Sequence, residues 1–243
     1  MAGNIAPYII KDSLVLYLDA ANTKSYVSGS TTWDDLSRDE NNGTLTNGPT
    51  FNSENGGSIV FDGIDDYFIT PTGLTPSLNI TSQITLETWF KSTSLANATH
   101  GDNLFSKGLS TDLNSGVYEL NLANNTTANI PSFRMRIGSS TPTYSPTNIL
   151  INLNQIYHIV CTYNGAIMRI FVNGIESGSG LSASGTIQNS TQQLTIGVRF
   201  VHRTGIADSF FSGNIYLSKI YNRALSATEV LQNYNATKGR FGL

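Results

Sequence analysis

Short runs that alternate between apolar and polar residues recur along the whole chain, each bounded by turn-forming residues. A period of two is typical of a β-strand with one buried face. The runs are SLVLYLDA, GSIVFDG, QITLETWF, NLFSKG, VYELNL, SFRMRIGS, IYHIVCTY, AIMRIFVN, QLTIGV and NIYLSKIY. So many short strands in 243 residues predict an all-β fold, a two-sheet antiparallel sandwich.

The run QITLETWFKS shows the expected alternation within one strand. Its apolar side chains Ile84, Leu86 and Phe90 fall on one face, and Glu87 and Lys91 fall on the other. This pattern predicts a strand that is half buried.

The dipeptide Asn164-Gly165 lies between two of the alternating runs. Asn-Gly readily adopts the positive φ angles of a tight hairpin turn. We therefore predict antiparallel strands at 157–163 and 166–172. A second turn is expected at Asn173-Gly174, followed by a loop rich in Gly and Ser at 177–185.

The segment LSATEVLQNYN is the one clear helical pattern. Ser226 and Glu229 have the spacing of a capping box, and Val230, Leu231 and Tyr234 form a short apolar stripe. We expect one short C-terminal helix docked on the edge of the sandwich. No internal repeat or linker divides the chain, so we expect an N-terminal arm at 1–12, one domain at 13–238 and a tail at 239–243.

Composition excludes several classes of function. The net charge is −3 and no basic patch is present, which argues against nucleic acid as a partner. No apolar stretch approaches the roughly 18 residues that span a bilayer, and the N-terminus lacks the features of a secretory signal. Cys161 is the only cysteine, so no intrachain disulfide is expected; it lies in an apolar strand and is interpreted as a buried hydrophobic residue.

Three carboxylates, Asp62, Asp65 and Asp66, fall within five residues where a strand meets a turn. Ca²⁺ binds six to eight oxygen ligands, and these side chains could supply some of them. Aspartate in a turn also accepts hydrogen bonds from backbone N–H groups two residues on, with no metal. The pattern predicts turn architecture, with a structural Ca²⁺ ion as the alternative.

The strands resemble a known family. The segments IVFDGIDDYF, ITLETWFKS, YHIVCTYNGAIMRIFVNGI, LTIGVRF and IYNRALSATEV occur in the order of a laminin-G-like domain of the concanavalin A-like lectin/glucanase superfamily. The resemblance covers roughly residues 13–236. It implies a jelly-roll sandwich, carbohydrate binding and, commonly, calcium at a loop on the rim. Tyr157 stands where the family usually has Trp, and Tyr216 where it often has Asp, which removes a carboxylate.

Some members of this superfamily hydrolyse glucans with paired carboxylates on one strand. Retaining hydrolysis needs two carboxyl groups about 5–5.5 Å apart, but Glu87 and Glu119 each stand alone in their strands. Asp62 and Asp66 have suitable spacing, although Gly63 indicates a bend. His158 is expected to be a packed strand residue, and the three histidines have no zinc-binding spacing. We therefore expect no enzymatic activity. Polysaccharide hydrolysis is kept as the least favoured hypothesis, after a structural or adhesion module and a lectin.

Carbohydrate binding would require exposed aromatic rings and planar polar groups. Trp33 lies in a polar loop and is a candidate stacking platform, with anchoring of that loop as the alternative. Arg199, His202 and Arg203 lie in a loop between strands that could face a ligand. Trp89 lies within a strand and is expected to be packed.

A narrower resemblance concerns the N-terminal third. LVLYLDAANTKSY, TTWDDLS and NNGTLTNGPTFN are similar to segments of structural proteins of tailed phages, notably marine ones. This implies a non-enzymatic structural or adhesion module of a virion, assembled in the bacterial cytoplasm, which decorates the capsid or tail and contacts surface glycans. Its partners would be other virion proteins or surface polysaccharide, with no membrane, and it would be a homo-oligomer or particle-bound. The alternative is a free-standing calcium-dependent lectin, exported by a non-classical route.

Overall fold

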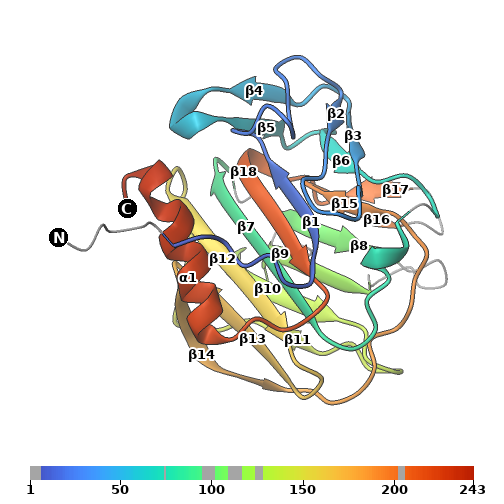
Figure 1. Cartoon of the computed structure of the whole chain (residues 1–243). Helices are drawn as coiled ribbons and strands as arrows, with labels where there is room; N and C mark the ends of the chain where they lie inside the picture. Colours follow the sequence, from blue (N-terminus) through green and yellow to red (C-terminus); the bar gives the residue numbers. More distant parts are fainter. Residues whose placement is uncertain (1–6, 74, 95–101, 109–116, 124–127, 202–205) are drawn as a thin grey trace.

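The computed structural model describes residues 7–73, 75–94, 102–108, 117–123, 128–201 and 206–243, and within them two antiparallel sheets pack face to face (Figure 1). The predicted all-β sandwich is confirmed. Sheet A comprises, in spatial order, β14 (Ile175–Ser182), β13 (Ile167–Val172), β12 (Ile156–Tyr163), β7 (Ile84–Ser92), β18 (Ser212–Tyr221), β5 (Ser58–Asp62) and β4 (Thr50–Asn52), and β1 (Leu14–Asp19) also pairs with β18.

Sheet B lies opposite sheet A. It comprises, in spatial order, β11 (Thr143–Tyr144), β10 (Ala128–Met135), β9 (Tyr118–Ala123), β8 (Asn103–Lys107), β15 (Leu194–Ile196), β6 (Tyr67–Ile69), β3 (Gly43–Thr46) and β2 (Thr32–Trp33). Two further strands, β16 (Arg199–Val201) and β17 (Ile206–Asp208), pair antiparallel with each other as a separate two-stranded sheet. Two short 3₁₀ helices, η1 (Glu54–Gly56) and η2 (Pro76–Leu78), lie in the connections.

The inner faces of the two sheets form one hydrophobic core. Ile84, Leu86 and Phe90 of β7 are fully buried there, as the period of two predicts, and they share the core with Leu120 and Phe133 of sheet B. Burial of apolar area at about 25 cal/mol per Å² is the main stabilising contribution in such a sandwich.

The predicted hairpin is confirmed at its turn and in its strands. β12 and β13 pair antiparallel, with Tyr163 opposite Met168. Gly165 has a φ of 91°, and the Asn164 side-chain oxygen accepts hydrogen bonds from the backbone N–H groups of Ala166 and Ile167. The second turn is also present, with φ angles of 51° at Asn173 and 80° at Gly174.

The predicted loop at 177–185 is wrong, because β14 continues through Ser182. Its pairing with β13 is interrupted by a bulge at Gly178–Gly180. The Tyr144 hydroxyl occupies this bulge: it donates to the Ser177 carbonyl oxygen at 2.8 Å and accepts from the Gly180 N–H at 3.0 Å. A side chain at position 178 would overlap that hydroxyl, so glycine is required there.

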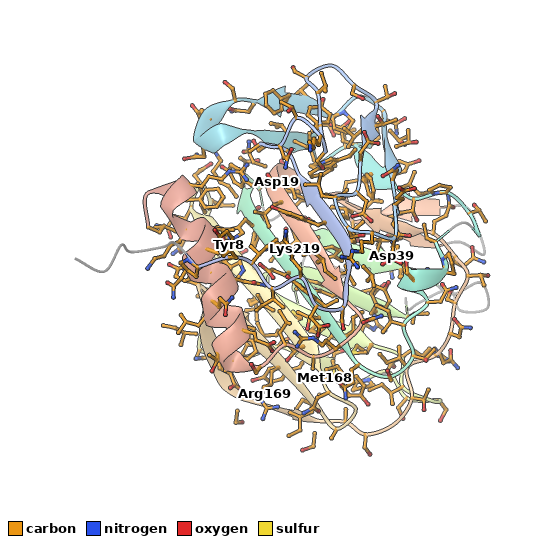
Figure 2. All side chains as sticks on the ribbon, in the orientation of Figure 1. Tyr8, Asp19, Asp39, Met168, Arg169 and Lys219 are labelled. Carbon is orange, nitrogen blue, oxygen red and sulfur yellow. The ribbon has the colours of Figure 1, made fainter. Side chains whose placement is uncertain are left out.

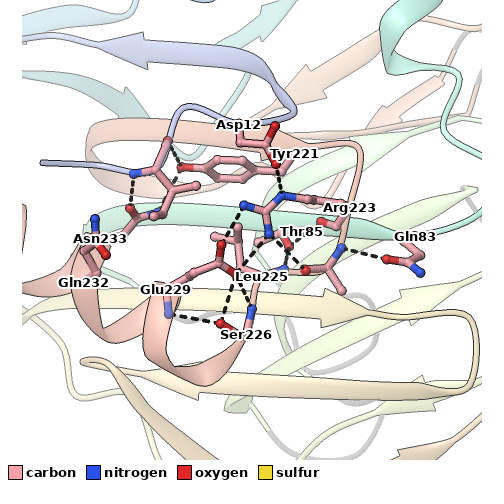
Figure 3. Close-up of polar contacts among 12 residues, drawn as sticks. Asp12, Gln83, Thr85, Tyr221, Arg223, Leu225, Ser226, Glu229, Gln232 and Asn233 are labelled. Atoms are coloured by element: carbon pink, nitrogen blue, oxygen red, sulfur yellow. Dashed lines mark hydrogen bonds and ion pairs between the residues drawn. The ribbon is translucent and has the colours of Figure 1, made fainter.

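The predicted C-terminal helix is α1 (Ala227–Thr237), with the expected capping box between Ser226 and Glu229. Arg223 adds an ion pair to Glu229 at 2.7 Å (Figure 3). The helix lies over the outer face of sheet A and is followed by η3 (Lys238–Phe241). Residues 240 and 241 pack against the sandwich and belong to the folded domain. No described helix is long and apolar enough to cross a membrane.

Candidate functional site

α1 and η3 cover the outer face of sheet A around Trp89 of β7. The Trp89 ring is fully buried and stacks against Tyr234 of α1 and Phe241 of η3, with centroid distances of 5.6 and 4.2 Å. Its indole N–H donates to the Thr237 hydroxyl at 2.9 Å. The expectation that Trp89 is packed is confirmed, and this face offers no open platform around it.

Charged groups are buried beneath this aromatic layer. Glu87, expected on a solvent-facing side, is fully buried, because α1 and the N-terminal segment cover that side of β7. Its carboxylate accepts hydrogen bonds from Lys219 Nζ at 2.7 Å, His158 Nε2 at 3.1 Å and Asn233 Nδ2 at 2.6 Å. Lys219 belongs to β18 and is labelled in Figure 2.

The ionisation states in this cluster follow from burial and the neighbouring charges. Burial would raise the pKa of Glu87, but the Lys219 ammonium and the His158 hydrogen bond outweigh it and lower this pKa to about 2. Burial also lowers the pKa of His158, so its imidazole is neutral at pH 7. An ionised carboxylate only accepts, so Nε2 carries the imidazole proton, and the buried Nδ1 has no hydrogen-bond partner. The prediction that His158 is a packed residue is confirmed.

The outer face of sheet B carries mostly polar side chains. They form one row of cross-strand neighbours that runs across all of the strands of this sheet. Cross-strand partners share a face of a sheet. From one edge to the other the row is Thr143, Arg134, Glu119, Ser106, Thr195, Ile69, Thr44 and Thr32. All of these residues except Ile69 are polar, and we call the row the polar ladder. A second row beside it joins Ser132, Asn121 and Asn103.

The polar ladder is buried in its middle and accessible at its ends. Glu119 is 1% exposed, whereas Arg134 is half-buried and Thr143 and Thr44 are exposed. Sequence reasoning treated Glu119 as an isolated strand acid and did not find Arg134, because their pairing depends on a register between strands that periodicity does not give.

Arg199 lies in the β16–β17 hairpin next to sheet B. Its guanidinium binds Asp208 through two hydrogen bonds, of 2.7 and 2.6 Å. Burial opposes its charge, but Asp208 and then Glu119 raise the pKa of Arg199, which places these three groups in one electrostatic cluster. The other two predicted ligand residues of this loop, His202 and Arg203, lie outside the described residues.

The prediction of Trp33 as an exposed stacking platform is wrong. Its ring is fully buried and packs edge-on against Phe68, with centroids 6.0 Å apart. The physical reason is that hydrogen bonds to the Asp35 side chain hold the loop after Trp33 against the sandwich. The Asp35 carboxylate accepts hydrogen bonds from the backbone N–H groups of Tyr17, Ser37 and Asn41. Trp33 therefore anchors this loop to the sandwich, the alternative raised for it above.

The acidic turn is built as the sequence suggested. The backbone N–H of Asp62 donates to Asp66 Oδ2 at 3.0 Å, and the N–H of Ile64 donates to Asp62 Oδ1 at 2.7 Å. Asp62, Asp65 and Asp66 bring carboxylate oxygens within 4.8 Å of one another, with Asp66 buried and the other two exposed. Such a donor set suits Ca²⁺, although two of its carboxylates already serve the turn.

The two packed antiparallel sheets agree with the jelly-roll sandwich that the sequence resemblance implies. The chain belongs to the concanavalin A-like lectin/glucanases superfamily: the family model matches residues 62–231. The family resemblance inferred from the sequence is thus confirmed. No curated protein matches the chain.

Solved structures of the same fold include domains from much larger proteins. Domain 4 of AbnA, an extracellular arabinanase from Geobacillus stearothermophilus solved with arabinotriose, is 21% identical, with a TM-score of 0.65 over 91% of this chain and 98% of that one. The receptor-binding domain of botulinum neurotoxin type G is 15% identical (TM-score 0.62, 91% and 51% covered). The Trypanosoma rangeli sialidase is 17% identical (TM-score 0.67, 98% and 36% covered). At these identities the likeness concerns the fold.

Proposed function

We propose that this protein is a non-enzymatic adhesion module that contacts saccharides through the outer face of sheet B. The observation that carries this proposal is the polar ladder. Around Trp89, α1 covers the outer face of sheet A, whereas the accessible ends of the ladder on sheet B present the Arg134 guanidinium and the hydroxyl groups of Thr143, Thr44 and Thr32.

The chemistry of the ladder suits a saccharide. Sugar hydroxyls both donate and accept hydrogen bonds, so a row of fixed donors and acceptors matches a row of hydroxyls. Arg134 supplies donors in a fixed fork, and Thr143 beside it can donate and accept. Both lie at the accessible end of the ladder, where a glycan chain meets them without displacing the buried middle.

Binding without catalysis is supported by the carboxylates near this face. Glu119 is the carboxylate of the ladder, and Asp208 is held by two hydrogen bonds from Arg199. A carboxylate whose two oxygens are occupied by charge-assisted hydrogen bonds is less available for chemistry on a bound sugar.

The finer placement that we propose is the surface of a tailed-phage particle, on the capsid or tail. Its support is the resemblance of the segments that fold as β1, β2, β3 and β4 to phage structural proteins. Mass spectrometry of purified virions tests this placement. Absence of the protein from all particle fractions of a producing strain would overturn it.

The alternative is a free-standing calcium-dependent lectin, and the acidic turn of Asp62, Asp65 and Asp66 supports it. A glycan panel probed in calcium and again in EDTA separates the two. Binding that survives EDTA supports the adhesion module, whereas binding that is lost in EDTA supports the calcium lectin.

The ladder is tested by Arg134→Ala with Arg169→Ala as the matched control. Arg169 lies on sheet A, half-buried and paired with Glu176. We expect Arg134→Ala to weaken glycan binding at least tenfold, which corresponds to about 1.4 kcal/mol, and Arg169→Ala to leave it unchanged. Equal affinities of the two variants would place the binding surface elsewhere.

A further inference from the structure

A lysine, a glutamate and an asparagine meet in the sealed layer of sheet A, and all three are 0% exposed. Lys219 Nζ lies 2.7 Å from Glu87 Oε1, and Asn233 Nδ2 lies 2.6 Å from Glu87 Oε2. One carboxylate therefore touches both an amine and a carboxamide. The sequence signals only part of this cluster, through a lysine in the apolar run NIYLSKIY.

The Lys219 ammonium is poorly satisfied for a buried cation. It has three N–H donors, and among the described residues its one hydrogen-bond partner is Glu87. The Tyr17 ring, 5.5 Å away, adds a cation–π contact. A buried charge with unmet donors is unfavourable, whereas a secondary amide at the same place would carry a single N–H, which Glu87 can accept.

The Asn233 carboxamide is positioned as the electrophile that an amine could attack. The backbone N–H of Ile10 donates to its oxygen Oδ1 at 2.8 Å, which is the arrangement that stabilises developing negative charge on a carbonyl oxygen. Its nitrogen Nδ2 also donates to the Tyr221 hydroxyl at 2.9 Å, drawn in Figure 3. These partners fix which amide atom is oxygen and which is nitrogen.

We propose that the chain joins Lys219 to Asn233 by an intramolecular amide bond, with Glu87 as the catalytic proton carrier. The ion pair keeps Glu87 ionised at rest, so moving a proton from the Lys219 ammonium to Glu87 Oε1 across their 2.7 Å hydrogen bond is an uphill step that makes the reaction slow. The freed amine then attacks Cγ of Asn233. The carbonyl electrons move onto Oδ1, where the Ile10 N–H stabilises them.

The tetrahedral intermediate formed at Cγ of Asn233 then breaks down, and every proton is accounted for. The Cγ–Nδ2 bond breaks as the carbonyl re-forms, and Glu87 passes protons from Nζ to Nδ2, which leaves as ammonium. Lysine ammonium and carboxamide thus become a secondary amide and one ammonium ion, and Glu87 ends as the carboxylate it was. No oxidant or co-reactant is consumed. The bond ties β18 to α1 and would hold the sealed face closed in a chain that has no disulfide.

Intact-mass spectrometry of the purified, denatured full chain tests the proposal. Loss of ammonia lowers the mass by about 17 Da relative to the sequence, and we expect this loss in the wild type. A digest with trypsin should contain one branched peptide in which 204–223, uncut at Lys219, is joined to 224–238.

Two variants separate the cross-link from a cyclic imide at Asn233, which would lose the same mass. Lys219→Met and Glu87→Gln should both retain the full sequence mass. A wild-type chain of full mass after prolonged incubation overturns the proposal whether or not the variants fold. A loss of ammonia that persists in Lys219→Met overturns it as well.

Discussion

Gly213 lies where β18 pairs with β7 on one side and β5 on the other, opposite Ser92 and Phe61. Its φ is 142°, and a Cβ atom there would overlap the carbonyl oxygen of Lys91. The replacement Gly213→Ala must therefore push two neighbouring strands apart in the middle of sheet A.

Two contributions determine how much free energy of unfolding the Gly213→Ala variant loses. Positive φ costs an L-residue about 1–2 kcal/mol. Separating the strands forfeits about two ladder hydrogen bonds of about 1 kcal/mol each. We expect Gly213→Ala to lower the free energy of unfolding by about 3–4 kcal/mol, out of a total stability of about 5–15 kcal/mol.

Gly165→Ala is the matched control. Gly165 also has positive φ, 91°, but its added Cβ would meet only Ser82 O, at 4.0 Å. We expect a loss of about 1 kcal/mol there. Urea unfolding followed by fluorescence measures both values. If the two variants lose equal free energy, the overlap with Lys91 does not exist and the register between β18 and β7 is wrong.

Three further predictions concern buried side chains. Asp102 is 4% exposed, and burial raises its pKa from 3.8 to about 7, so its ionisation destabilises the fold as pH rises through that window. Asp102→Asn should therefore raise Tm at pH 8 and change it little at pH 4; the same shift at both pH values would refute this. Asp66→Ala should lower Tm more than Asp39→Ala, because Asp66 accepts the Asp62 N–H while Asp39 is exposed, and equal melting temperatures would contradict it. Trp89→Ala should cost about 3–5 kcal/mol in urea unfolding, and a loss under about 1 kcal/mol would mean that α1 does not depend on this ring.

The sequence predicted the strands well where they are long and alternate, and where the turn is local. The β12–β13 hairpin depends on Asn164 and Gly165, which are adjacent, and the capping box on residues three apart. Some of the shortest strands, such as β2 and β11 with two residues each, were not predicted, because so short a run shows no period.

The sequence predicted less well which face of a strand is buried and which is exposed to solvent. Alternation separates the two sides of β7, but it does not reveal that the polar side is covered by a helix more than a hundred residues later. Glu87 was therefore placed in solvent and is buried against Asn233. Trp33 shows the opposite error: it was considered as an exposed ring because its neighbours are polar. Those polar neighbours hydrogen-bond to one another, and the Trp33 ring is buried.

The Tyr144 hydroxyl in the bulge of β14 has a consequence for the behaviour of the protein in concentrated solution. Among the described strands, β14 forms an edge of sheet A with no further neighbour, and such edges invite pairing between molecules. Tyr144 occupies a carbonyl and an N–H of that edge, and the bulge breaks the regular spacing that an incoming strand would need. A molecule crowded among its copies is thereby protected from uncontrolled strand exchange at this edge.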